Sequence, residues 1–375
     1  MSGIYIHIPF CACRCLYCGF YSTTRLEARD NYVMALCSEI RAHAGDAGFR
    51  RPSTLYIGGG TPSQLSPEQI GRIIGEADRA FGLEELQEAT IECNPDDISD
   101  DFLTGISRTP INRISLGIQS LDDAVLRFIR RRHTASQAID AVRRCADSGI
   151  SNISADLIYG LPGQTAESFR NDIVTVAGLG VMHISAYCLT YEEGTPLYRL
   201  AEEGRLRRTD DDTCADMYTI LCDTMRSLGF VHYETSNFCR PGFHSRHNSC
   251  YWDGTHYLGL GAGAHSFDGR TRRWNVSDID RYMESAISGS SCQEYETLSE
   301  ADLQNEMVML SLRTHKGLSM NDFRARFGNQ AADRIMKISE SWIQKGDLIR
   351  EGDTLRLSEP GLFLGDGIVC SLFVG

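Results

Sequence analysis

Six short apolar runs, each rich in Ile, Val or Tyr, recur along the first half of the chain and are separated by segments of helical length. Short runs of this composition are typical of buried strands. The predicted strands are IYIHI (4–8), TLYIG (54–58), ATIEC (89–93), RISLGI (113–118), ISADLIYG (153–160) and HISAYCL (183–189). The amphipathic patterns at 66–81, 134–149 and 165–180 each open with Ser or Thr as a plausible N-cap, which predicts helices between the strands.

This alternation of strand and helix predicts a parallel sheet. Repeated βα units need right-handed crossovers, and each crossover helix packs back onto the sheet. Six such units in a row can curl into an open barrel or lie flat as a doubly wound sheet. The pattern alone does not choose between the two.

The second half of the chain changes in character. A long helix is predicted at 210–229, followed by a strand-like segment at 230–238 and a glycine- and aromatic-rich stretch at 241–267. From about residue 300 the pattern is mostly helical and ends in short strands around LIREGDTLRLS. This tail predicts a small helical domain with a β-wing.

The length of 375 residues exceeds that of one average domain. We expect a core barrel over 1–200, a connecting region over 201–295 and a C-terminal domain over 296–375. A hydrophobic fraction of 42% and a charged fraction of 23% are those of an ordinary globular protein. The net charge of -13 argues against broad affinity for nucleic acid or anionic membranes, because both need a basic protein surface.

The N-terminus shows no basic segment followed by a long apolar one, and nowhere do 18 apolar residues run together. We therefore expect a cytoplasmic protein without a transmembrane segment. In that compartment the 14 cysteines should stay reduced and available to metals.

Three of these cysteines lie close together directly after the first predicted strand. Cys11, Cys15 and Cys18 have the spacing Cys-x3-Cys-x2-Cys, with Cys13 inside the first gap. Three thiolates on one loop can bind three irons of a [4Fe–4S] cubane cluster and leave the fourth iron open to an external ligand. A structural zinc site, with Cys13 or His7 as its fourth ligand, is the alternative. The position after a strand of a βα array favours the cluster, since ligand sites form there.

Further candidate residues follow the next strands. The turn GlyGlyGlyThrPro at 58–62 can let the backbone approach a ligand closely, although a plain tight turn is the alternative. It lacks the Lys of a phosphate-binding loop. Glu92, Gln119 and Asp156 lie at or beyond the ends of the third, fourth and fifth strands, where a barrel presents its ligands. Each alone could be a satisfied polar residue.

Together these motifs resemble the radical S-adenosylmethionine (SAM) superfamily, and within it the branch of the oxygen-independent coproporphyrinogen III oxidases. YIHIPF, IGGGTPS, RISLGIQS, DLIYGLPGQT and the end domain extend the resemblance over nearly the whole chain. It implies an α/β fold, a partial TIM barrel (β/α)6 with a small C-terminal winged-helix-like domain. It also implies that Cys11, Cys15 and Cys18 bind the [4Fe–4S] cluster. The SAM site that it implies consists of Tyr5, Tyr17, Gly59, Gly60, Thr61, Glu92, Gln119, Arg131 and Asp156, with the flanking Arg130 and Arg132 as alternatives to Arg131.

Three features of the chain resemble the HemW family of heme chaperones more than the oxidases. Phe20 stands where the oxidases have a fourth cysteine, and the chain ahead of Cys11 is too short to hold their N-terminal extension. HisAsnSerCysTyrTrp at 247–252 is similar to the heme-binding signature of the chaperones. Imidazole is a good axial ligand of heme iron and aromatic faces suit a flat macrocycle, so the heme contacts implied are His247, Tyr251 and Trp252. Cys250 is a second or alternative ligand, and a hydrogen-bonded structural role is the alternative for His247.

We therefore expect a heme chaperone that binds heme and a SAM-ligated [4Fe–4S] cluster and transfers heme to an acceptor protein. The first alternative is an oxygen-independent coproporphyrinogen III oxidase, which decarboxylates propionate side chains in porphyrin biosynthesis. The second is another radical SAM enzyme acting on tetrapyrroles. Expected partners are heme, a heme-acceptor protein and an electron donor for the cluster, but no nucleic acid. A monomer or a homodimer is expected.

Overall fold

Six parallel strands pair with one another in their order along the chain. The structure is a computed structural model that describes residues 2–374. The six strands are β1 (Gly3–Ile8), β2 (Thr54–Gly59), β3 (Glu88–Cys93), β4 (Arg113–Gln119), β5 (Asn152–Tyr159) and β6 (His183–Cys188). Right-handed crossovers between strands in unbroken order place every connecting helix on one face, so the sheet curls. A doubly wound sheet reverses its strand order, so this order confirms the predicted (β/α)6 barrel.

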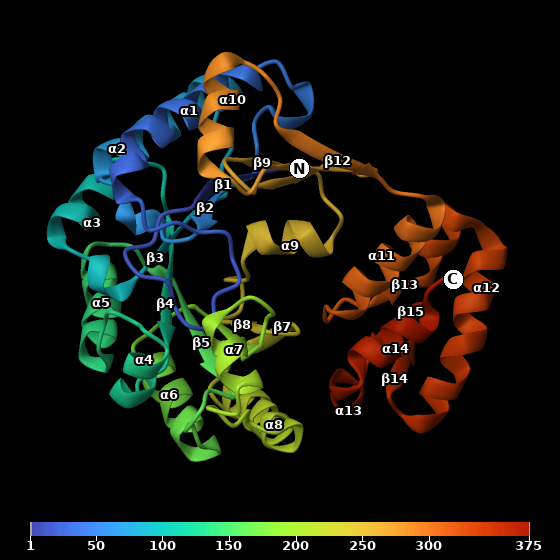
Figure 1. The fold of residues 1–375 in the computed structure, drawn as a ribbon. Helices are drawn as coiled ribbons and strands as arrows, with labels where there is room; N and C mark the ends of the chain where they lie inside the picture. Colours follow the sequence, from blue (N-terminus) through green and yellow to red (C-terminus); the bar gives the residue numbers. More distant parts are fainter. Residues whose placement is uncertain (1, 375) are drawn as a thin grey trace.

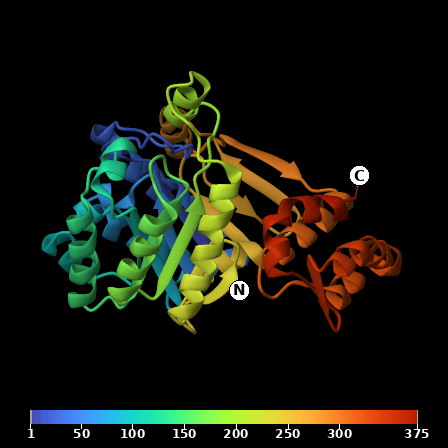
Figure 2. The same cartoon turned by 90° about the horizontal axis from the view of Figure 1, so that it is seen from below.

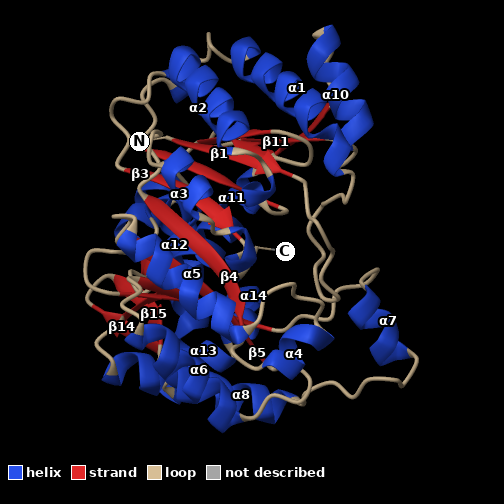
Figure 3. Ribbon diagram, turned by 90° about the vertical axis from the view of Figure 1, so that its left-hand side faces the viewer, coloured by secondary structure: helices blue, strands red, loops and turns tan. Residues whose placement is uncertain are grey.

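The helices that follow these strands cover the outer face of the curled sheet, except for α7, which lies beside the loop after β1 (Figures 1 and 3). They are α1 (Arg29–Ala42), α2 (Pro67–Phe81), α3 (Asp100–Ile106), α4 (Asp123–Phe128), α5 (Ala135–Asp147), α6 (Ala166–Gly178), α7 (Pro196–Glu202) and α8 (Asp211–Ser227), with the 3-10 turns η1 (Leu26–Ala28), η2 (Ala47–Phe49), η3 (Pro62–Gln64) and η4 (Pro95–Asp97). Ser66, Thr134 and Thr165 cap α2, α5 and α6, as their positions in the sequence predict. Apolar residues that alternate along the strands form the main core between sheet and helices.

Further strands extend the sheet at both edges. At one edge, β9 (Tyr257–Leu260) pairs in parallel with β1, and antiparallel β10 (His265–Phe267), β11 (Thr271–Asn275) and β12 (Gln293–Thr297) follow. At the other edge lie β8 (Asn237–Cys239) and β7 (Val231–Glu234). The prediction of one strand-like segment at 230–238 is wrong, because the chain turns between β7 and β8. The Glu234 carboxylate stabilises that turn by accepting hydrogen bonds from the Ser236 N–H and the Asn237 amide.

Two helices of the connecting region lie on different sides of the sheet. The outer one is α10 (Ile279–Ser288), which packs beside α1 (Figures 1 and 3). The other, α9 (Arg246–Trp252), lies on the concave inner side near the start of β2. The segment predicted to contact heme therefore faces the barrel interior.

The C-terminal part has its own hydrophobic core beside the barrel (Figure 2). Its elements are α11 (Glu300–Leu312), β13 (Leu318–Ser319), α12 (Met320–Lys345), β14 (Leu348–Glu351), β15 (Thr354–Leu357), α13 (Glu359–Phe363) and α14 (Gly365–Leu372). These helices with a small antiparallel sheet match the predicted winged-helix-like domain. Gly328, with φ +85°, interrupts α12. Within the described chain, no helix combines the length and apolar character needed to cross a membrane.

A buried carboxylate joins α1 to the strands at the edge of the barrel. Glu39 accepts hydrogen bonds from the Gly261 N–H (2.8 Å), the Asn275 amide (2.6 Å) and the Tyr282 hydroxyl (2.6 Å). These three donors come from β9 and its following loop, from β11 and from α10. One side chain therefore holds together segments more than 200 residues apart in sequence.

We expect Glu39→Ala to lower the free energy of unfolding by about 3 kcal/mol, because three buried donors lose their acceptor. The measurement is urea denaturation followed by circular dichroism. Glu27→Ala is the control, since the Glu27 side chain is 75% exposed. Equal effects of the two substitutions would contradict the structural role of Glu39.

Candidate functional site

The three cysteines lie on the loop that leaves β1 at the carboxyl end of the barrel. Cys11 is buried and Cys15 and Cys18 are half-buried, whereas Cys13 is exposed and its thiol bonds only to the neighbouring Arg14 carbonyl. The Cys11 sulfur lies 3.5 Å from the Thr61 hydroxyl. Burial raises the pKa of both Cys11 and Cys18, which favours the neutral thiols until a cation is bound.

The glycine-rich turn after β2 packs directly against this loop. The Gly60 N–H donates to the Ile8 carbonyl at 2.8 Å. A Cβ at Gly60 would lie 2.9 Å from the Phe10 carbonyl oxygen and 3.0 Å from that of Pro9. Gly59 adopts φ +117°, and a Cβ there would meet the His7 ring at 2.6 Å. Only glycine lets these two segments approach so closely.

Glu92, at the end of β3, turns its carboxylate toward the glycine turn. It accepts hydrogen bonds from the Gly59 N–H at 3.1 Å and from the Tyr56 hydroxyl at 2.7 Å. Burial raises the pKa of Glu92 to about 7, and the bond from Tyr56 opposes this shift. The carboxylate therefore changes charge close to neutral pH.

Gln119 and Asp156 complete the rim on the next two strands. Gln119 has φ +68°, which is uncommon for a residue with a side chain, and lies at a bulge in the β4–β5 pairing. Such strain is typical of functional sites. Asp156 accepts hydrogen bonds from Ser115 at 3.3 Å, and burial raises the pKa of its carboxyl.

Arg131 is the arginine that reaches the cysteine loop. Its guanidinium donates to the Asn94 side chain (2.6 Å) and the Gly117 carbonyl (2.5 Å), and lies 3.5 Å from the Cys15 sulfur. Arg130 is exposed, and Arg132 pairs with Asp96 and Asp97 on η4. The structure thus distinguishes three neighbouring arginines that the sequence left as alternatives.

Two predicted aromatic residues flank this rim. Tyr17 packs against a small apolar cluster that includes Leu126 and Ile158. Tyr5 points into the barrel, where its hydroxyl lies 3.0 Å from Nδ1 of His7 and its ring stacks on Tyr56. Of the residues predicted to contact SAM, Tyr5 lies deepest.

The donor set at the rim suits an anionic iron–sulfur cluster. Cys11, Cys15 and Cys18 are free thiols on one loop, and the Arg131 cation lies beside them. Among the described residues, no three His, Cys, Asp or Glu side chains converge on a point where they could bind a single metal ion. Cubane thiolates bind separate irons, so they do not need to converge. The residues present therefore fit the group.

The other predicted site lies on α9 at the opposite end of the barrel strands. Glu88, at the start of β3, accepts hydrogen bonds from the Arg246 N–H (2.9 Å) and the His247 N–H (3.0 Å). The His247 ring adjoins Thr54 at the start of β2 and Gly3 at the start of β1. The strands are about six residues long, so roughly 20 Å of barrel separates this helix from the cysteine loop.

Both ring nitrogens of His247 have hydrogen-bond partners. Nδ1 lies 2.9 Å from the Thr54 hydroxyl, and Nε2 lies 3.0 Å from the Tyr251 hydroxyl. Burial lowers the pKa of His247 to about 3, so the imidazole is neutral. These contacts are those of a structural histidine. Coordination of iron through Nε2 would require Tyr251 to move.

Tyr251 and Trp252, in contrast, face open space. Both line a cleft of about 780 Å³ between α9, the ends of β6 and β8, and the C-terminal domain. Burial raises the pKa of Tyr251, and its hydroxyl is the partner of His247 Nε2. Tyr251 and Trp252 of the predicted heme motif therefore line the cleft, whereas His247 lies behind these two side chains.

The two ends of the barrel are connected by contacting side chains. The His247 ring stacks on Tyr56 with 5.1 Å between centroids, and the Tyr56 hydroxyl donates to Glu92. Tyr5 stacks on both aromatic rings. The connection joins a residue predicted to contact heme to one predicted to contact SAM.

Sequence reasoning missed several residues of these sites. Asn94 follows β3 directly, and its position just beyond a strand end was an available signal. Glu88 and Arg113 lie at strand starts, where no motif marked them. Arg113 is 2% exposed inside the barrel, and in the described chain its Nε has no hydrogen-bond partner.

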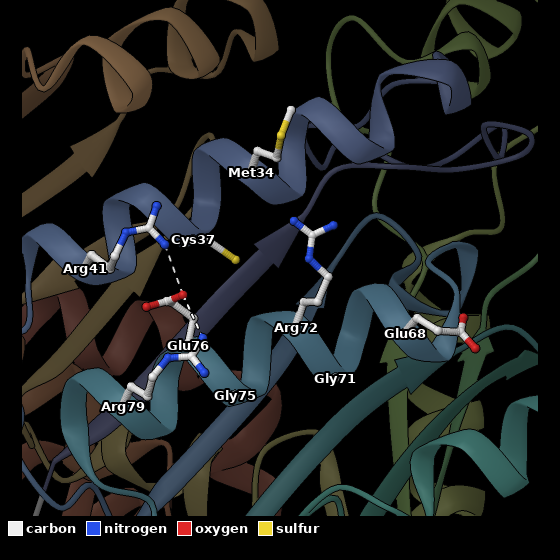
Figure 4. Close-up of a pocket in the computed structure, with 9 residues that line it drawn as sticks. All are labelled: Met34, Cys37, Arg41, Glu68, Gly71, Arg72, Gly75, Glu76 and Arg79. Carbon is white, nitrogen blue, oxygen red and sulfur yellow. Dashed lines mark hydrogen bonds and ion pairs between the residues drawn. The ribbon is translucent and has the colours of Figure 1, made fainter.

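A further hollow, of about 560 Å³, lies on the outer surface between α1 and α2 (Figure 4). Gly71 and Gly75 leave room there, while Arg41 and Arg79 both pair with Glu76. None of the predicted site residues lines this hollow. It does not belong to the site.

Comparison with family models identifies two segments of the chain. Residues 5–175 match the radical SAM superfamily, and residues 298–364 match the HemN C-terminal domain. The first segment covers the barrel from β1 to β5 and ends within α6, and the second covers most of the C-terminal domain.

The chain also resembles individual proteins over nearly its full length. It is 35% identical to the heme chaperone HemW of Lactococcus lactis, covering 98% of this chain and 96% of the relative. It is 34% identical to the heme chaperone HemW of Bacillus subtilis, covering 98% of each. The solved structure of the coproporphyrinogen III oxidase HemN from Escherichia coli shares the fold, with a TM-score of 0.86 and 23% identity over 100% of this chain and 90% of that one.

We expect Glu92→Gln to stabilise the protein increasingly as pH rises. The pKa of Glu92 in the folded state, about 7, exceeds its ordinary value of 4.5, so the stability that its protonated form contributes is lost between about pH 4.5 and 7. The carboxylate also faces the open barrel interior, where solvent screens its charge. The gain in the free energy of unfolding at pH 8 should therefore be on the order of 1–2 kcal/mol.

Urea denaturation at pH 5 and pH 8 measures this difference. Glu284→Gln, at an exposed position of α10, is the control and should show no pH-dependent gain. A Glu92→Gln variant with the same pH profile as wild type would show that Glu92 titrates normally.

Proposed function

Because the chain belongs to the HemW family of radical SAM proteins, we propose that it is a heme chaperone, which binds heme together with a SAM-ligated [4Fe–4S] cluster and passes heme to an acceptor protein. The observation that carries this proposal against an oxidase is Phe20. Its ring is 72% exposed beside the cysteine loop, where the oxidases have a fourth cysteine. A phenyl ring neither ligates iron nor relays a proton.

In this proposal Cys11, Cys15 and Cys18 hold the cluster. Their thiols lose their protons on binding, and the neighbouring Arg131 guanidinium stabilises the resulting negative charge. When bound, the cluster supplies one electron at a time and an open iron position for SAM. Tyr17 supports the loop through its apolar contacts.

The rim residues would bind SAM. The ionised Glu92 carboxylate and the backbone of Gly59, Gly60 and Thr61 suit an ammonium group. Asp156 and Gln119 offer acceptors and donors on the adjacent strands, and Tyr5 closes the interior below them. Each residue has the burial and position that such a ligand needs, which supports the assignment.

His247, Tyr251 and Trp252 would serve the heme. Tyr251 and Trp252 offer aromatic surface to a flat macrocycle from the side of the cleft. The coproporphyrinogen oxidase alternative shares the fold, and the experiments below separate the two functions.

We expect Cys15→Ser to abolish the brown absorption of the anaerobically reconstituted protein, whereas Cys13→Ser retains it. The reason is that Cys15 lies beside Arg131 on the inner side of the loop, while the Cys13 thiol points to solvent. Absorption spectra and iron and sulfide analysis measure the outcome. Zinc in place of iron and sulfide, or retention of the cluster in Cys15→Ser, would refute the ligand assignment.

The reconstituted wild-type protein should bind heme stoichiometrically and should not decarboxylate coproporphyrinogen III when SAM and reductant are supplied. Heme binding is followed by the Soret band and product formation by chromatography. Appearance of a vinyl product would overturn the chaperone proposal in favour of the oxidase.

Tyr251→Phe tests whether His247 binds the iron. If it does, heme must displace the Tyr251 hydroxyl from Nε2, so the variant should bind heme about threefold more tightly, with an unchanged Soret maximum. His247→Ala should shift that maximum. An unaltered spectrum in His247→Ala would show that another residue coordinates the iron.

A further inference from the structure

The cleft in front of α9 has two walls from distant parts of the chain. One wall carries Tyr251 and Trp252 of α9 and Tyr187 of β6, and the other carries Trp342 of α12 and Phe363 of α13. In Figure 1, α9 faces the C-terminal domain across this region. The volume of about 780 Å³ falls within the range of roughly 300–1,000 Å³ usual for small-molecule sites.

Two buried polar atoms at this cleft have no hydrogen-bond partner among residues 2–374. They are Nε1 of Trp252 and Oδ1 of Asn237. Asn237 is only 4% exposed, although its other amide atom bonds to Glu234. Both residues line the cleft, but the two atoms are buried, so a ligand or water in the cleft reaches them only when their side chains shift.

A cation lies at the mouth of the cleft. Arg313, at the end of α11, lines both this cleft and an adjoining cavity of about 260 Å³. Its backbone is fixed, because its carbonyl accepts hydrogen bonds from the Thr235 N–H at 3.1 Å and the Thr235 hydroxyl at 3.2 Å. Among residues 2–374, the guanidinium forms its one ion pair with Asp366, whose side chain is 89% exposed. Such an exposed pair is weak and can be exchanged readily.

We propose that the C-terminal domain forms half of the tetrapyrrole site: the macrocycle lies between the α9 wall and the wall of Trp342 and Phe363, and Arg313 pairs with a propionate carboxylate. This inference rests on the proposed heme-binding function. Aromatic walls on two sides and a single mobile cation at the edge suit a ligand that is flat, apolar in its middle and anionic at its rim. Arg313 contacts the turn between β7 and β8. Ligand binding to Arg313 is therefore linked to the position of the C-terminal domain.

The experiment titrates the reconstituted full-length protein with hemin and, separately, with hemin dimethyl ester, which lacks the carboxylate charges. We expect Arg313→Ala to weaken hemin binding about tenfold and to change ester binding less than about twofold. Asp366→Asn removes the competing carboxylate and should strengthen hemin binding about two- to threefold. Phe363→Ala, at a position 48% exposed, should weaken both ligands about threefold.

Arg143→Ala is the control, because Arg143 forms a solvent-exposed ion pair with Asp140 on α5 and does not line the cleft, so the substitution should have no effect. Failure of the wild-type protein to bind hemin would overturn the proposed function and this inference together. Wild-type binding with Arg313→Ala, Asp366→Asn and Phe363→Ala all unchanged would overturn the inference alone. An equal loss for hemin and its ester in Arg313→Ala would exclude the propionate pairing.

Discussion

The pairing of β1 to β6 in chain order is the constraint on which the rest of the structure depends. It sends every crossover to the outer face, so the inner face receives no helix from the βα units and closes around alternate side chains. It also brings all six carboxyl ends to one rim. Residues as far apart in sequence as Cys15 and Arg131 therefore lie in contact there. The strand order, more than any single side chain, determines where the site forms.

The barrel interior is lined by polar side chains. A core that held no ligand would not tolerate them. Burial raises the pKa of Glu92 and Asp156 and lowers that of His247, so the charged form of each group is less favoured in the barrel than in water. Hydrogen bonds compensate part of this cost. A folded protein retains such groups where their chemistry is used. The stack of His247 on Tyr56 and the hydrogen bond from Tyr56 to Glu92 form a continuous series of contacts between α9 and the residues beside the glycine turn.

Local sequence patterns predicted the six strands and the capped helices α2, α5 and α6, because each follows from periodicity and capping within a few residues. The gathering of Glu92, Gln119 and Asp156 at one rim was likewise predictable, since each follows a strand. The hairpin at β7–β8 was not, because it depends on the side chain of Glu234 bonding two residues ahead. Nor could the sequence show that both nitrogens of His247 are engaged, as their partners Thr54 and Tyr251 are set by tertiary packing.

The attachment of the C-terminal domain differs in strength from the packing of the barrel. The domain meets the barrel through main-chain hydrogen bonds of Thr235 with Arg313 and of His315 with Tyr233, through exposed ion pairs such as Arg226 with Glu359 and Lys316 with Asp253, and through a Tyr218–Phe363 edge contact. Exposed pairs contribute about 0–1 kcal/mol each, far less than the buried apolar core of the barrel. The wall of Trp342 and Phe363 is therefore held to the barrel less firmly than the strands of the barrel are held to one another. A protein that must release a bulky planar ligand to another protein needs a wall of this kind, whereas an enzyme that retains its substrate through successive reactions gains from a rigid one.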